Sequence, residues 1–121
     1  MADSGIGVKD ETRGEARVLS PEGDIDLNAS PALREVVRGV LESGGAKVVV
    51  VDLSMVDYMD SSGVATLVDA MRSARKAGVR LWLSSLGPQV RSIFEIARLD
   101  RVFDIASTAD EAIERSGGED G

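Results

Sequence analysis

A continuous run from Val48 to Leu53 constrains the fold of this chain more than any other feature. It holds four consecutive valines, and only Asp52 interrupts its apolar character. A short β-branched run of this kind is typical of a strand that is buried on both faces of a parallel sheet. Downstream, apolar residues recur at the spacing of one helix face, at Val64, Leu67, Val68 and Met71. This stretch therefore predicts a buried strand followed by a helix over about residues 61–77.

The same alternation of strands and helices continues along the chain. Further helices are expected where a capping residue or a proline marks a first turn, at Ser30-Pro31, Gly87-Pro88 and Thr108. Further strands are expected over residues 79–83 and 102–105, with Trp82 facing opposite to its two leucine neighbours. The pattern predicts one α/β domain over residues 15–116, with a mixed, mostly parallel sheet of about four or five strands and about four helices.

The two ends of the chain give weaker signals. Residues 1–14 are expected to be poorly ordered or to form a weak edge strand around residues 6–8. After a turn at Arg13-Gly14-Glu15, a second short strand over residues 16–19 would pair antiparallel at one side of the sheet. Residues 117–121 are expected to form a flexible tail.

Composition argues against several classes of function. The 121 residues include no cysteine and no histidine, so thiol chemistry, disulfides, cysteine-ligated zinc and a Ser-His-Asp triad are impossible. The net charge of −7 argues against binding nucleic acid or an anionic membrane. No apolar run approaches a membrane span, and residues 1–14 show no signal-peptide core. We therefore expect an acidic, soluble, cytoplasmic protein that needs no metal or cofactor.

The tetrapeptide from Asp60 to Gly63 is the main candidate for function. It is small and polar, and it lies where the buried strand gives way to the helix, at the carboxyl edge of the sheet. Asp60 or Ser61 would cap the helix. The serines could serve only the helix start, or one could accept a phosphate beside the free amides of the first turn. Gly63 would let another protein approach the backbone closely.

Acidic residues near this tetrapeptide allow two other interpretations. Asp52, Asp57 and Asp60 could form a magnesium site with a phosphoacceptor aspartate, as in response-regulator receivers. That fold also needs an acidic pair after its first strand and a lysine after its last parallel strand, and the chain has neither. Asp24 and Asp26 could form a turn before the first helix, or they could join Asp60 in an acidic recognition patch.

Several short motifs accompany the tetrapeptide along the chain. They are Asp52-Leu53-Ser54 before Met59-Asp60-Ser61-Ser62-Gly63-Val64, Gly23-Asp24-Ile25-Asp26 before Ser30-Pro31-Ala32-Leu33, Pro88-Gln89-Val90-Arg91, and Leu99-Asp100-Arg101-Val102-Phe103. Together they resemble STAS domains of the bacterial anti-sigma-factor antagonist type. The resemblance covers roughly residues 19–115, and the first eighteen residues depart from the family pattern.

The resemblance implies a switch protein with no catalytic activity. It implies phosphorylation of Ser61 by a serine kinase of the histidine-kinase-like ATPase type, which is also the anti-sigma factor and binds only the unphosphorylated antagonist. A PP2C-type phosphatase would reverse the modification. The docking surface would include Asp24, Asp26, Asp60, Ser62 and Gly63. A STAS interaction subunit that binds the ATPase of an ABC-type lipid transporter is an alternative, and the missing catalytic bases argue against an enzyme.

Overall fold

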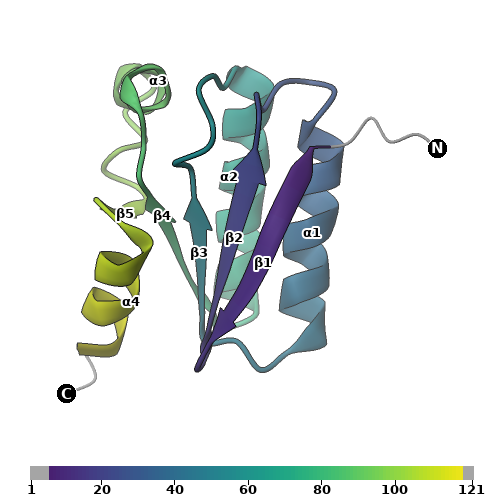
Figure 1. Cartoon of the computed structure of the whole chain (residues 1–121), viewed down its shortest axis with the longest axis vertical. Coiled ribbons are helices and arrows are strands. Elements are labelled where there is room, and N and C mark those ends of the chain that lie inside the picture. The colour runs from purple at the N-terminus through teal and green to yellow at the C-terminus, as the bar shows by residue number, and fades with distance from the viewer. Residues whose placement is uncertain (1–5, 119–121) are drawn as a thin grey trace.

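A computed structural model describes residues 6–118 as a five-stranded sheet with four helices (Figure 1). The strands are β1 (Gly7–Arg13), β2 (Ala16–Glu22), β3 (Val48–Asp52), β4 (Arg80–Ser84) and β5 (Asp104–Ala106). The helices are α1 (Ser30–Ser43), α2 (Ser61–Lys76), α3 (Pro88–Ile96) and α4 (Ala109–Gly118). The strands lie in the order of the sequence; β1 is antiparallel to β2, and all other neighbours are parallel. The predicted mixed, mostly parallel α/β fold is confirmed.

The valine run forms β3, the central strand, and it is buried on both faces as predicted. Val49 and Val51 belong to a large core on the side of α1 and α2, whereas Val50 packs with Trp82 on the side of α4. Figure 1 shows α1 and α2 on one side of the sheet and α4 on the other. Trp82 therefore faces opposite to Leu81 and Leu83, as the alternation of a strand requires.

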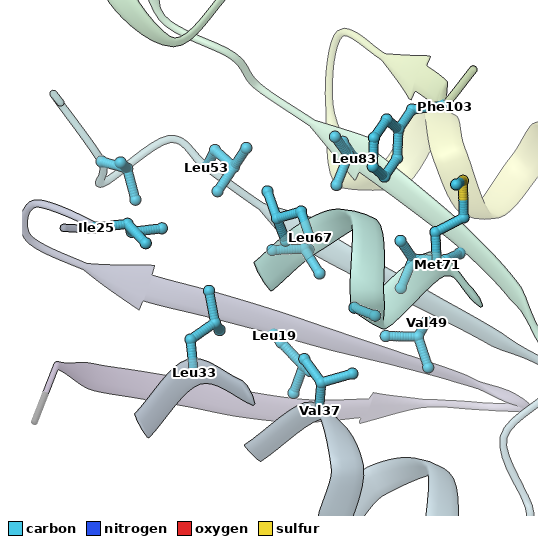
Figure 2. Close-up of a cluster of buried hydrophobic side chains, with 14 of the residues drawn as sticks. Leu19, Ile25, Leu33, Val37, Val49, Leu53, Leu67, Met71, Leu83 and Phe103 are labelled. Carbon is cyan, nitrogen blue, oxygen red and sulfur yellow. The ribbon is translucent and has the colours of Figure 1, made fainter. Parts of the chain in front are cut away.

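The large core fixes the position of α2 against the sheet. Figure 2 shows Leu67 and Met71 of α2 among side chains from α1, β2, β3 and β4. Leu67 is fully buried, as are Leu19 of β2 and Leu83 of β4. Because α2 begins directly at the candidate site, this packing also holds the site's backbone in place.

The N-terminal edge of the sheet is more regular than the sequence suggests. β1 is a seven-residue strand paired along its length with β2, and Gly14 makes the turn between them with φ of 59°. Ion pairs, such as Asp10 with Arg17, support the ladder, and Val8 is the residue of β1 that packs against the large core. The prediction of a weak strand at residues 6–8 was wrong in extent, because backbone pairing does not need the apolar alternation that the sequence lacks.

Other boundaries shift by one to three residues, the largest shift being the end of β2, which lies at Glu22 and not at residue 19. The N-cap of α1 is Ala29, because the Ser30 hydroxyl donates to the Asp26 carbonyl instead of capping. β5 begins at Asp104 and not at residue 102, while Phe103 packs edge-on against Phe94 in the core. The helix α4 continues to Gly118, so residues 117–118 are helical where a tail was expected. The expectations for residues 1–5 and 119–121 lie outside the described residues.

No helix within residues 6–118 combines the length and apolar character needed to cross a membrane.

Truncating Leu67 should test how far the fold depends on the packing of α2. Leu67→Ala is expected to lower the free energy of unfolding by about 2–5 kcal/mol, because it leaves a cavity in the core. Leu27→Ala is the matched control: this leucine is 72% exposed, and its truncation should change stability by less than about 0.5 kcal/mol. Urea denaturation followed by circular dichroism measures both, and equal losses would contradict the assignment of Leu67 to the core.

Candidate functional site

Two loops lie side by side at the carboxyl edge of the sheet. One follows β2 and leads into α1, and the other follows β3 and leads into α2. Ile25 and Met59 form a parallel bridge between them. Three backbone hydrogen bonds join the loops: Gly23 N to Met55 O (3.1 Å), Ile25 N to Tyr58 O (3.0 Å) and Asp60 N to Ile25 O (3.2 Å). The chain therefore continues strand-like pairing past the ends of β2 and β3 and fixes the backbone before Ser61.

A third element, α3, contributes a side chain to the same loop. The Gln89 amide donates to the Met59 carbonyl (2.9 Å) and accepts from the Met59 amide (2.8 Å). Both polar groups of this half-buried side chain are thereby satisfied. The motif around Gln89 did not predict this role. A polar residue between Pro88 and Val90 in the first turn of a helix was the only signal.

Asp60 is the N-cap of α2, which settles one of the alternatives left open by the sequence. Its carboxylate accepts hydrogen bonds from the amides of Ser62 (2.8 Å) and Gly63 (3.3 Å). A negative charge at this position also interacts favourably with the helix dipole. Ser61 is thus not needed as a cap, and its side chain is available for another purpose.

Ser61 is the first residue of α2 and its side chain is exposed. Within the described residues, its hydroxyl has no hydrogen-bond partner. Ser62 is half-buried, so the two adjacent serines differ in access. Of the two, Ser61 presents the hydroxyl that an external enzyme could reach.

Gly63 is buried, and this corrects the reason given for it from the sequence. A Cβ atom here would lie 2.6 Å from the Met59 Cγ and 2.8 Å from the Ile25 carbonyl oxygen. The space next to the glycine is therefore filled by the chain's own Ile25–Met59 bridge and is not open to another protein. Gly63 allows α2 to pack onto the paired loops.

The structure places Asp24 and Asp26 next to Asp60. They flank Ile25, whose carbonyl accepts the hydrogen bond from the Asp60 amide. The Asp26 carboxylate accepts from the amides of Asn28 and Ala29, both at 3.0 Å, which is the turn predicted before α1. Asp24 is exposed. The backbone pairing of the two loops thus places the predicted Asp24 and Asp26 on the loop beside Asp60, although Asp26 also has a structural role.

Asp52 has a different environment, at the end of β3. Its carboxylate accepts hydrogen bonds from the hydroxyls of Ser54 (2.6 Å) and Ser84 (2.8 Å). Burial alone would raise the pKa of this carboxyl, but the hydrogen bonds from Ser54, Ser85 and Ser84 outweigh burial and lower the pKa below its usual value. In residues 6–118, no three acidic side chains gather as a metal site would need. Nothing in this arrangement supports the receiver-type magnesium site.

Exposed apolar side chains lie on the same two loops, and they were not among the predicted site residues. Leu27 is 72% exposed, Met55 54% and Tyr58 45%. Large apolar residues in otherwise polar loops were the available signal. Leu27 lies on the loop before α1, whereas Met55 and Tyr58 lie on the loop before α2 and pair with the first loop through their backbone carbonyls.

The sequence and the fold were compared with those of known proteins. The family model described as "STAS domain" matches residues 8–112. The match starts within β1, so the family pattern extends further toward the N-terminus than residues 19–115.

Individual relatives agree with that match. An anti-sigma-B factor antagonist of Listeria monocytogenes is 32% identical over 89 residues, which are 74% of this chain and 77% of the relative. The crystal structure of an anti-sigma factor antagonist from Mycobacterium paratuberculosis has a TM-score of 0.83 at 26% identity, covering 94% of this chain and 96% of that one. The Bacillus cell fate determinant SpoIIAA in the phosphorylated form has a TM-score of 0.70 at 25% identity, covering 91% and 99%.

Gly63→Ala should destabilise the protein. The added methyl group would collide with Met59 and the Ile25 backbone, and we expect a loss of about 1–3 kcal/mol in the free energy of unfolding. Gly39→Ala is the matched control, because Gly39 lies on the exposed face of α1 and no packing neighbour comes within 4 Å of the place that a methyl group would take. That substitution should stabilise by about 0.5–1 kcal/mol. Urea denaturation of both variants is the measurement, and a stable Gly63→Ala variant would contradict the packing argument.

Stability should depend on pH through Asp52. The folded-state pKa lies below the unfolded value of about 3.9, so ionised Asp52 stabilises the fold above that pH, and the effect is lost as pH falls through the folded pKa. Asp52→Asn should therefore cost about 1 kcal/mol at pH 7. Its difference from the wild type should shrink below about pH 4. Asp100→Asn, at an exposed loop position, is the control. Denaturation curves across this pH range measure the difference in stability between Asp52→Asn and the wild type. A difference that stayed constant with pH would refute the stabilising role of ionised Asp52.

Proposed function

The chain belongs to the STAS domain family, and we propose that it is an anti-sigma-factor antagonist controlled by phosphorylation of Ser61. The observation that carries the proposal is the state of Ser61: exposed, without a hydrogen-bond partner in the described residues, and at the first residue of α2. Relatives with the name anti-sigma-B factor antagonist support it, as does the solved SpoIIAA relative described in its phosphorylated form.

In the unmodified state, the two paired loops would bind the partner. Leu27, Met55 and Tyr58 supply apolar area, and Asp24, Asp26 and Asp60 supply charge for orientation and specificity. The expected partner is a serine kinase of the histidine-kinase-like ATPase type that also acts as the anti-sigma factor. The antagonist contributes a surface and an acceptor hydroxyl, and the kinase contributes the chemistry.

Phosphorylation would change binding without changing the fold. A phosphate adds about −1.5 to −2 charges at pH 7. The Asp60 carboxylate already accepts from the amides of Ser62 and Gly63, so the phosphate finds little unused hydrogen-bonding capacity at the helix start. Burying it under a partner beside Asp60 would cost several kcal/mol. A cost of about 3 kcal/mol is roughly a hundredfold in affinity, enough to release the kinase. A PP2C-type phosphatase would restore the binding form.

Ser61→Ala should abolish phosphorylation and leave the fold intact. Because Asp60 provides the cap, the substitution should change stability by less than about 0.5 kcal/mol. Ser62→Ala is the matched control and should still gain one phosphate. Intact-mass analysis after incubation with ATP and the kinase-like ATPase encoded nearest to this protein gives the readout. A phosphate on Ser61→Ala would show that the acceptor is elsewhere.

The phosphorylated and unmodified proteins should differ in affinity for the kinase but not in structure. Calorimetry should show about hundredfold weaker binding of the phosphorylated form. Amide chemical shifts should change over residues 59–67 and stay nearly constant around Trp82 and Phe103, which are both buried. Equal affinities, or shift changes across the whole sheet, would refute the electrostatic mechanism.

A further inference from the structure

A groove of about 790 Å³ lies between α1 and α2, on the side of the sheet away from α4. Its floor includes the buried Val37 and Ala70. Its walls carry four cationic side chains: Arg34, Arg38, Arg72 and Lys76. The groove differs in composition from the acidic loops described above.

The charge of this groove is opposite to that of the whole chain. The four cations face only two lining carboxylates, Glu42 and Asp69, in a protein whose net charge is −7. Arg34 and Arg38 are four residues apart in α1, and so are Arg72 and Lys76 in α2. Like charges at this spacing destabilise a helix by about 0.2–0.5 kcal/mol per pair. Both helices thus concentrate positive charge toward one groove, and oppositely charged neighbours such as Glu35 beside Arg38 offset part of this repulsion.

The two walls differ in how far their charges are neutralised. On α1, Arg34 pairs with Asp69 at 3.4 Å, and Arg38 pairs with Glu35 at 3.1 Å. On α2, neither Arg72 nor Lys76 forms an ion pair with any residue in the range 6–118. The α2 wall therefore presents two cations that an acidic ligand could neutralise.

On α2 the groove begins at Thr66, five residues after Ser61. Ser62, Thr66, Asp69 and Ser73 recur at the spacing of one helix face, and the last three line the groove. From Thr66 to Lys76, α2 rises about 15 Å, the length of about ten helical residues. A protein seated over Ser61 could therefore reach the groove with a neighbouring segment.

We propose that the groove binds an acidic segment of the protein that docks on the Ser61 surface, through carboxylates placed against Arg72 and Lys76. This inference rests on the proposed function, since it adds a second contact for the same kinase. The cations along the groove match a segment with several carboxylates, and charge complementarity of this kind speeds association and fixes register. The contact lies away from the Ser61 hydroxyl, so it would orient the kinase without blocking the acceptor.

Zero-length cross-linking with a carbodiimide tests the contact directly, because the reagent joins an amine to an adjacent carboxylate. The chain has three lysines, and two of them already pair with this chain's own glutamates: Lys9 with Glu22, and Lys47 with Glu15. We expect the complex with the kinase to give a Lys76 cross-link to an aspartate or glutamate of the kinase. Cross-links to the kinase at Lys9 or Lys47 alone, or a Lys76 cross-link to a second copy of this chain, would overturn the proposal.

Charge reversal gives an independent measurement on the whole protein. Arg72→Glu with Lys76→Glu should lower the association rate with the kinase by about tenfold or more and weaken its dependence on salt. Arg98→Glu with Arg101→Glu changes the total charge equally, at two exposed positions after α3, and should change the rate by less than about twofold. Equal effects of the two double variants, or no effect of either, would overturn the inference while leaving the proposed function intact. If the wild-type protein fails to bind the kinase at all, the proposed function itself fails, and the inference fails with it.

Discussion

The close contact of Gly63 with Ile25 and Met59 is the constraint on which the site depends. A side chain at this position would separate α2 from the paired loops, because its Cβ atom would meet both a side chain and a backbone oxygen at less than 3 Å. The contact brings the start of α2 against the bridge between the loops after β2 and β3. Through the packing of Leu67 and Met71, the sheet then holds the helix at that place (Figure 2). Ser61 is thus presented by a rigid backbone, although it lies on the surface.

A rigid frame with an exposed hydroxyl suits a protein that others modify. The folded core would gain or lose little if a phosphate were added to Ser61 as proposed, since Ser61 lies on the surface and Asp60 already completes the helix start. In the proposed function, a phosphate on Ser61 would act at the interface with the partner, where burial makes its charge costly. The shape of the molecule can stay constant while its affinity changes.

The central part of the fold could be predicted because its signals are local. The valine run, the stripe of α2 and a cap at the start of this helix each follow from residues close together in the sequence, although the structure was needed to choose Asp60 over Ser61 as the cap. β1 could not be predicted in full, because a polar edge strand is held by its backbone ladder and by ion pairs with β2. The burial of Gly63 and the bonds of Gln89 to Met59 arise from contacts between segments about 30–40 residues apart, and sequence spacing says nothing about them. The groove could not be predicted from the sequence either, because its two walls come from different helices.

The cap at Asp60 also bears on what the unmodified surface can distinguish. Helix starts commonly bind free phosphate or sulfate through the amides of their first turn. Here the two amides of Ser62 and Gly63 are already occupied by a carboxylate of the same chain, which is present at a high local concentration and does not dissociate. A dissolved anion would have to displace that carboxylate, whereas a phosphate on Ser61 is held there by a covalent bond. The Asp60 carboxylate would therefore shield the helix start from dissolved phosphate, whereas a phosphate transferred to Ser61 by a kinase, as proposed, would still be held beside it.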